Sequence, residues 1–189
     1  MLLFTAEQLS LSTAASSSKE VSDTINQLSE SVGQLLIDQK LSITTAESCT
    51  GGLVAAALTA ISGSSAYFGS GIISYSNESK RRLLGVPAAQ LATHGAVSEA
   101  VVLAMADGAR QRNHAQVSVA VSGIAGPDGG SANKPVGTVW IAWSVPVQNR
   151  THLKAQRFIF SGDRNAIQRG AVLESLRGII ALLSTHEMT

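Results

Sequence analysis

The sequence has little of several features that define whole classes of proteins. It contains one cysteine, Cys49, among 189 residues, which excludes an intrachain disulfide framework and a cysteine-based zinc site. Only 14% of the residues are charged and the formal net charge is +1, so the clustered Lys and Arg that bind nucleic-acid phosphates are lacking. No apolar run approaches the ~20 residues that cross a bilayer. We therefore expect neither a nucleic-acid partner nor a membrane association.

The N-terminal residues do not read as a targeting signal. Met1-Leu2-Leu3-Phe4 is apolar but lacks a basic region, and Glu7 follows shortly after, so we expect a soluble, cytoplasmic protein without a signal peptide. Residues 1–18 are rich in Ser, Thr and Ala without a steady period, which predicts a loosely ordered extension. The apolar fraction, 44%, can supply a core, and we expect residues 19–189 to form a single domain.

Apolar periodicity predicts strands that alternate with helices. The expected helices cover residues 21–40, about 50–61, 76–85, 98–113 and the segment after 163, and the expected strands cover 41–46, 71–75, 117–121, 138–145 and 152–160. Residues 146–150 form a short connection suited to an antiparallel hairpin. The pattern predicts an α/β layered domain with a mixed sheet.

Glycines gather after two of the expected strands, at Gly51-Gly52 and at four positions between 123 and 130. Ligands of open α/β sheets collect beyond the carboxyl ends of the strands, so these loops are the default pocket. A helix that begins near Thr50 would offer free N–H groups and a positive dipole end to an anion. The spacing matches neither a P-loop nor the dinucleotide fingerprint, and glycines at such places also serve simply as tight turns.

Ser48 lies at a strand-to-helix junction, where a hydroxyl can be exposed to a substrate. A serine needs a neighbouring base to act as a nucleophile. Lys80 is one candidate, because a desolvated lysine can lose its proton, and His94 with Asp128 is the other. The alternative interpretation of Ser48 is a helix N-cap, the commonest role of serine at such a position.

Several other side chains each have two interpretations. Arg164 either clamps a phosphate or pairs with Asp163 at the surface. Tyr75 either donates a hydrogen bond to a ligand or packs in the core, and Cys49 is either a rival nucleophile or inert filler. Glu47 either orients a catalytic group or complements a helix dipole. The four histidines have no metal-site spacing, so we expect no metal.

Five motifs in fixed order make the sequence resemble a known family. They are Thr45-Ala-Glu-Ser-Cys-Thr-Gly-Gly52, Tyr75-Ser-Asn-Glu78 with Lys80, His94-Gly-Ala-Val-Ser98, Ser122-Gly-Ile-Ala-Gly-Pro-Asp-Gly-Gly130 and Lys134-Pro-Val-Gly-Thr-Val139. Together, over residues from about 21 to 184, they resemble the C-terminal domain family of competence/damage-inducible protein A (CinA), and within it the stand-alone nicotinamide-nucleotide amidases.

The resemblance implies a three-layer α/β/α fold with a mixed, mostly parallel sheet, and a homodimer or higher homo-oligomer. It also implies cofactor-independent hydrolysis of the carboxamide of nicotinamide mononucleotide to nicotinate mononucleotide and ammonia, a step of pyridine nucleotide salvage. Some close paralogues are thought to lack this activity, so a silent nucleotide-binding module is the alternative.

The family's site residues fall on particular positions of this sequence. The resemblance implies Ser48 as the nucleophile, with Lys80, Tyr75 and Ser122 around it; many relatives have threonine at position 122, where the hydroxyl is retained. We expect Arg164 and the backbone of the glycine-rich loops to hold the phosphate, and amides at the start of the helix after Ser48 to hold the oxyanion. The expected substrate-binding residues are Thr50, Gly51, Gly52, Gly123, Gly126 and Arg164.

Overall fold

The computed structural model describes residues 6–148 and 150–184. Its elements in chain order are α1 (Ala6–Asp38), β1 (Ile43–Glu47), α2 (Leu53–Thr59), the 3₁₀ turn η1 (Ser64–Ala66), β2 (Phe68–Ile73), α3 (Asn77–Leu84), α4 (Ala88–His94), α5 (Glu99–Arg112), β3 (Val117–Gly123), β4 (Thr138–Val147), β5 (Arg150–Ile159) and α6 (Arg164–Ser184).

The five described strands form one mixed sheet in the order β2-β1-β3-β4-β5. β1 pairs in parallel with both β2 and β3, whereas β4 pairs antiparallel with β3 and with β5. All described strands except β4 therefore run in one direction, which confirms the mixed sheet. β1 and β3 are buried along their length, as expected for central parallel strands covered on both faces.

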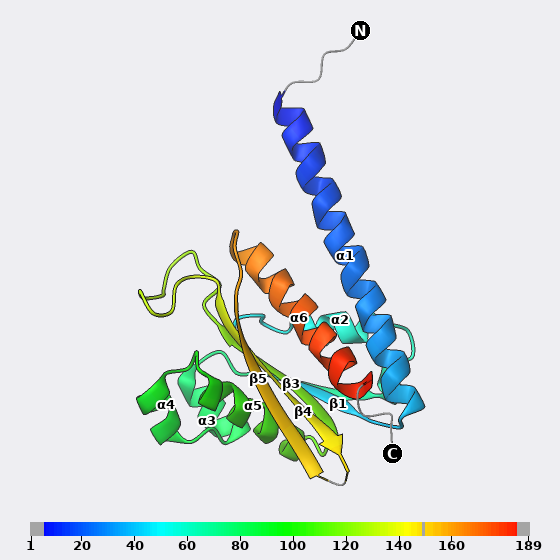
Figure 1. Cartoon of the computed structure of the whole chain (residues 1–189), viewed down its shortest axis with the longest axis vertical. Helices are drawn as coiled ribbons and strands as arrows, with labels where there is room; N and C mark the ends of the chain where they lie inside the picture. Colours follow the sequence, from blue (N-terminus) through cyan, green and yellow to red (C-terminus); the bar gives the residue numbers. More distant parts are fainter. Residues whose placement is uncertain (1–5, 149, 185–189) are drawn as a thin grey trace.

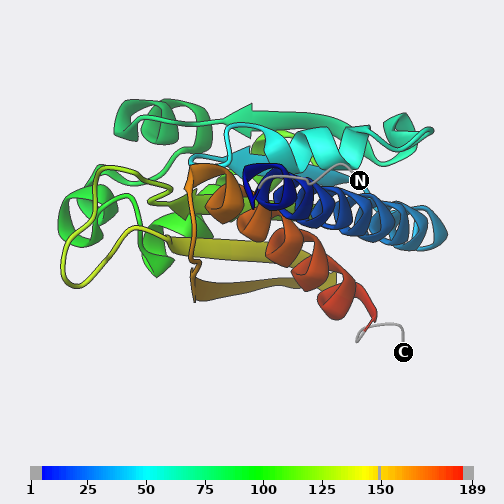
Figure 2. The ribbon, with the colours of Figure 1, turned by 90° about the horizontal axis from the view of Figure 1, so that it is seen from above.

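Helices cover both faces of the sheet, which confirms the α/β layered architecture (Figures 1 and 2). α1, α2 and α6 lie on one face, over a large core that includes Leu36, Leu58, Val119, Ile141 and Leu176. The N-terminal part of α1 extends away from the sheet, at the top of Figure 1.

The opposite face is covered by α5, with α3 and α4 packed against it (Figure 1). This second core is rich in alanine, with Ala46, Ala106, Ala109, Ala120 and Ala142 all buried. Small side chains at an interface let the backbones approach closely, so α5 lies tight against the strands. Ser98 is the N-cap of α5, and its side chain accepts a hydrogen bond from the N–H of Val101, as the sequence predicts.

Most strand ends differ from the predicted ones by about two residues, and the larger differences lie in the helices and in β2. α1 begins at Ala6 rather than near residue 21, because residues 6–20 contain neither glycine nor proline to stop the helix. β2 begins three residues earlier than predicted, and α2 begins at Leu53 rather than near Thr50. α4 has no counterpart in the prediction. Residues 1–5 of the predicted extension lie outside the described residues, and its loose order remains a prediction.

Candidate active site

Three serines lie in register where the neighbouring strands β2, β1 and β3 end. The N–H of Ser74 donates to the carbonyl of Glu47 at 2.7 Å, and the N–H of Ser48 donates to the carbonyl of Val121 at 3.0 Å. The ladder thus continues one step past β1 and places Ser48 between Ser74 and Ser122. The residues two positions earlier in each strand pack in the second core. Because side chains alternate along a strand, all three serines point to the face that α5 covers.

Lys80 of α3 reaches Ser48 from that face. Its Nζ lies 2.9 Å from Oγ of Ser48 and 2.8 Å from the carbonyl oxygen of Ser74. The lysine is 1% exposed and Ser48 is 8% exposed. No carboxylate of the described chain forms an ion pair with Lys80. The sequence-predicted pair of a serine and a lysine is therefore brought together in a buried contact.

Burial lowers the pKa of Lys80 to about 8, because desolvation penalises the charged ammonium. The Cys49 thiol, the second and weaker influence, acts in the opposite direction. A lysine with this pKa is partly neutral near neutral pH, and a neutral amine has a lone pair that can accept a proton from a hydroxyl.

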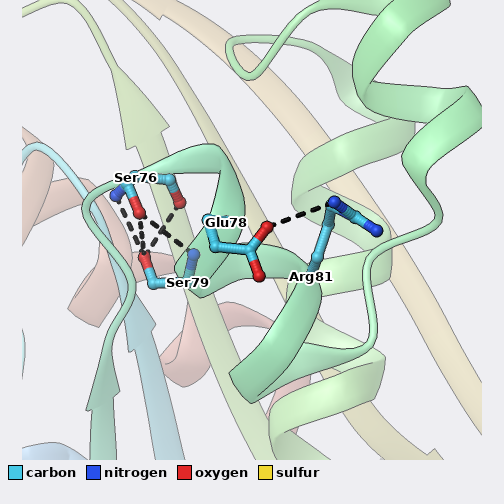
Figure 3. A network of polar contacts seen from close by, with 4 residues as sticks. All are labelled: Ser76, Glu78, Ser79 and Arg81. Carbon is cyan, nitrogen blue, oxygen red and sulfur yellow. Dashed lines mark hydrogen bonds and ion pairs between the residues drawn. The ribbon is translucent and has the colours of Figure 1, made fainter.

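The first turn of α3 is fixed by a reciprocal cap, which positions Lys80 (Figure 3). Oγ of Ser76 accepts a hydrogen bond from the N–H of Ser79, and Oγ of Ser79 accepts one from the N–H of Ser76, each at 3.0 Å. Glu78 and Arg81 form an exposed ion pair at 3.1 Å on the outer side of the helix, where such pairs contribute little stability.

The packing of α3 against α5 depends on Gly108. A Cβ added at Gly108 would overlap the carbonyl oxygen of Leu84, which belongs to the last turn of α3. Leu84 stands one turn after Lys80, so the close approach at Gly108 also sets how near Lys80 comes to the sheet.

Glu47 holds the turn that follows Ser48. Its carboxylate is fully buried and accepts hydrogen bonds from the N–H groups of Gly52, Val54 and Ala55 at 2.9, 3.1 and 2.8 Å. Gly51 and Gly52 have positive φ values of 63° and 104°, which glycine adopts without strain. Glu47 thereby occupies the N–H groups of Gly52, Val54 and Ala55, so these three amides are not available to hold an oxyanion.

The turn still offers other donors. The N–H groups of Cys49 and Thr50 make no hydrogen bond to another residue of the described chain. Oγ1 of Thr50 and Oγ of Ser74 are also buried without a partner in that part of the chain. Unpartnered polar groups next to a buried Ser48–Lys80 contact are typical of a site that completes its hydrogen bonds with a ligand or water.

Cys49 is buried in the same turn, and burial raises the pKa of its thiol to about 12. The interpretation of Cys49 as inert filler is favoured, because the thiolate is not populated at neutral pH. Its carbonyl oxygen accepts a hydrogen bond from Nε2 of Gln168 in α6 at 2.7 Å. Sequence reasoning missed Gln168, and no local signal marks it, because the contact joins residues 119 positions apart.

Tyr75 and Arg164 form a second group at the same edge of the sheet. Nη2 of Arg164 donates to the Tyr75 hydroxyl at 2.9 Å, and Nη1 donates to the carbonyl of Gly126 at 2.8 Å. Tyr75 is 62% exposed, so the alternative of a core aromatic is wrong. Arg164 makes no ion pair with Asp163, whose Oδ1 instead accepts the N–H of Ala166.

Ser122 and Gly123 line the other side of Ser48. Oγ of Ser122 is buried and donates to the carbonyl of Ala96 at 2.8 Å, in the loop before α5. Gly123 is needed for packing, since an added Cβ would lie 2.7 Å from Cγ2 of Val139. Substrate binding by Gly123 and Gly126 remains a prediction.

The alternative base is not assembled at Ser48. His94 is the last residue of α4, not a loop residue, and its exposed imidazole makes no hydrogen bond to Ser48. Its carbonyl oxygen accepts a hydrogen bond from Nζ of Lys134 at 2.8 Å. Asp128 is exposed and contacts neither residue through a hydrogen bond or ion pair.

Among the described residues, no group of three or more His, Cys, Asp or Glu side chains could hold a metal ion. Within the same ranges, no helix is both long and apolar enough to span a bilayer.

The fold and this site define an α/β domain that carries a buried serine–lysine pair at the carboxyl edge of a mixed sheet. A model of the CinA C-terminal domain matches residues 25–183. The chain belongs to the CinA C-terminal domain family.

Relatives and solved structures agree with this assignment. The chain is 52% identical over 151 residues to the nicotinamide-nucleotide amidohydrolase PncC of Escherichia coli (strain K12), covering 80% of this chain and 90% of that protein. It is 47% identical over 160 residues to PncC of Pseudomonas putida, covering 85% and 98%. The crystal structure of the competence/damage inducible protein CihA from Agrobacterium tumefaciens superposes with a TM-score of 0.81 at 42% identity, covering 84% and 95%.

Proposed function

We propose that this chain hydrolyses the carboxamide of nicotinamide mononucleotide to nicotinate mononucleotide and ammonia, with Ser48 as the nucleophile and Lys80 as the base. The observation that carries the proposal is the 2.9 Å contact between Lys80 Nζ and Ser48 Oγ, in a buried place where the pKa of the lysine falls to about 8. The names of the relatives, nicotinamide-nucleotide amidohydrolase, supply the substrate class.

In the first step, Oγ of Ser48 attacks the amide carbon while its proton passes to the neutral amine of Lys80. The carbonyl oxygen of Ser74 accepts one N–H of that amine at 2.8 Å, which leaves the lone pair free to face Ser48. This arrangement requires no histidine, and it matches the serine–lysine form of nucleophilic catalysis.

The tetrahedral intermediate carries a negative oxygen that needs donors already in place. The unpartnered N–H groups of Cys49 and Thr50 follow the nucleophile directly, in the position where backbone donors stabilise oxyanions in other strand–turn–helix sites. Glu47 and Gln168 hold this turn from two sides, through the N–H groups of the α2 start and the carbonyl of Cys49.

Collapse of the intermediate breaks the C–N bond, and the ammonium of Lys80 gives its proton to the departing nitrogen, which leaves as ammonia. The product of this half-reaction is an ester between Ser48 and the nicotinoyl group. Lys80, neutral again, then takes a proton from a water that attacks the ester carbon. The second collapse returns this proton to Ser48 and releases nicotinate mononucleotide.

The rest of the substrate lies over the loops around this centre. The exposed ring of Tyr75 can contact the cationic pyridinium, which also makes the amide carbon more electrophilic. Arg164 fixes the Tyr75 hydroxyl and the carbonyl of Gly126, and so defines one wall of the site. Binding of the phosphate by Arg164 and the glycine-rich loop is part of the proposal, as is a homodimeric or larger assembly.

The direct test is incubation of the purified protein with nicotinamide mononucleotide, with ammonia and nicotinate mononucleotide both quantified. We expect equal amounts of the two products, in proportion to protein concentration. Binding without release of either product at high protein concentration would identify the silent nucleotide-binding module instead. Neither binding nor turnover would reject both functions.

The base is tested by comparing Lys80→Ala with His94→Ala, after both are shown by circular dichroism to fold. We expect Lys80→Ala to lose at least about 10³-fold in kcat, as loss of a catalytic base does in related mechanisms. His94→Ala should stay within about threefold of the wild type, because its side chain does not contact Ser48. The reverse ranking would assign the base to His94.

A further inference from the structure

A lysine, Lys134, lies beyond Ser122 in a series of contacts that starts at Ser48. Ser122 stands next to Ser48 in the ladder, and its Oγ donates to the carbonyl of Ala96. The neighbouring Gly95 has Lys134 Nζ 3.7 Å from the position of an added Cβ. This series of contacts leads from the reactive hydroxyl to the ammonium of Lys134, which belongs to the glycine-rich segment between β3 and β4.

The environment of Lys134 leaves its ammonium able to bind an anion. Nζ has three N–H donors, and the carbonyl of His94 accepts one of them at 2.8 Å. In the part of the chain that the structure describes, no carboxylate forms an ion pair with Lys134. The side chain is half-buried although the three residues before it are exposed. Its charge is therefore held in place but not neutralised.

The segment that carries Lys134 is itself anchored. Nη2 of Arg157 in β5 donates to the carbonyl of Asn133 at 3.1 Å, and the backbone of Ser131 and Lys134 forms an isolated antiparallel bridge. Arg164, by contrast, already uses both terminal nitrogens on protein acceptors. Two of the three N–H donors of Lys134 have no acceptor in the described chain, so Lys134 can add a phosphate contact to any that Arg164 makes.

We propose that Lys134 binds the phosphate of the substrate and makes the enzyme select a nucleotide over the corresponding nucleoside. The inference rests on the proposed function and assigns a specificity residue within that site. The contacts above connect Ser48, through Ser122 and the Gly95–Ala96 segment, to the ammonium of Lys134 at the same edge of the sheet. The carboxamide carbon and the phosphorus of nicotinamide mononucleotide are joined by about nine bonds, which span about 10 Å when extended.

The test compares kcat and KM for nicotinamide mononucleotide and nicotinamide riboside in the wild type, Lys134→Met and Lys134→Arg. Lys154→Met, an exposed lysine of β5, is the matched control. Loss of one charge-assisted contact predicts an increase of about 10- to 100-fold in KM for the nucleotide with little change in kcat. The parameters for the riboside should not change, Lys134→Arg should retain most of the nucleotide preference, and Lys154→Met should match the wild type.

Two results would overturn the inference. An equal loss on both substrates would mean that Lys134 only ties its segment to α4 through the His94 carbonyl. Unchanged selectivity in Lys134→Met would place the phosphate elsewhere.

A calorimetric titration with ribose 5-phosphate keeps this test independent of turnover. If the wild type hydrolysed neither substrate, the proposed function would fail, but binding of ribose 5-phosphate that weakens about 10-fold or more in Lys134→Met would still support the phosphate subsite. Binding that does not depend on Lys134, or no binding by the wild type, would reject it.

Discussion

The pH dependence of turnover follows directly from the burial of Lys80. The proposed mechanism needs the neutral amine, and the pKa of Lys80 is lowered to about 8 because no carboxylate of the described chain compensates its desolvation. With this value, roughly a tenth of the protein has a neutral Lys80 at pH 7, about half at pH 8 and roughly nine tenths at pH 9. We therefore expect kcat/KM to rise about 10-fold from pH 7 to pH 9, with a midpoint near 8.

Few other groups interfere with this measurement. The substrate phosphate has its second pKa near 6, so its ionisation is mostly complete at pH 7 and changes little from pH 7 to pH 9. The thiol of Cys49, which lies beside Lys80, has its pKa raised to about 12 and stays protonated.

The assay is ammonia release at subsaturating nicotinamide mononucleotide between pH 6 and pH 10, with Lys80→Arg as the matched variant. Arginine keeps a positive charge across this range, so the variant should be inactive at every pH. A flat profile in the wild type would refute the reasoning. So would a midpoint between 6 and 7 that disappears in His94→Ala, because the titrating base would then be an imidazole.

Four further outcomes are expected. Lys80→Met should raise the free energy of unfolding at pH 7 by up to about 3 kcal/mol, because lowering the pKa of Lys80 from 10.5 to about 8 opposes folding by that amount. Urea titrations should show that this gain in stability shrinks from pH 8 to pH 10.5. In that range Lys80 is still protonated in the unfolded wild type but has lost its proton in the folded wild type, so the burial of its charge no longer opposes folding. A gain that does not change with pH would contradict the shift. Gly108→Ala should displace α3 and lower both kcat and the melting temperature, whereas Ala104→Gly in the same helix, as a control, should affect only stability. Native protein at pH 8 should resist alkylation of Cys49 by iodoacetamide, with rapid modification only after denaturation; fast native labelling would contradict its burial. Gln168→Ala should lower kcat more than it raises KM, because it releases the carbonyl of Cys49 and not a substrate contact; a change in KM alone would exclude this positioning role.

Local pattern predicted the architecture well, because capping and helix-stopping residues mark where helices begin and end. Ser98 caps α5 and Gly85 ends α3, as the sequence indicated. The short helix α4 was missed because its seven residues carry only Leu91 as a buried side chain, too few for a visible period. α2 begins later than predicted because the two glycines that follow Thr50 adopt positive φ and delay the helix.

The site was only partly predictable. Local pattern offered Ser48 as a nucleophile or an N-cap and Lys80 as one of two bases, and the family resemblance chose between these alternatives. The mutual contact of Ser48 and Lys80 needs the fold, because it joins residues 32 positions apart. Glu47 follows the second of its two interpretations, because its buried carboxylate complements the start of α2 and accepts three backbone hydrogen bonds there. Such contacts depend on where a side chain points at the end of a strand, which no one-dimensional pattern records.

The central claim is that the hydroxyl of residue 48, and not the thiol beside it, attacks the amide. Ammonia release by Ser48→Ala and Cys49→Ala, measured at equal protein concentration and pH 8.5, decides between them. The account predicts that Ser48→Ala falls at least about 10³-fold below the wild type while Cys49→Ala stays within about threefold. A Ser48→Ala protein that releases ammonia at the wild-type rate would contradict it.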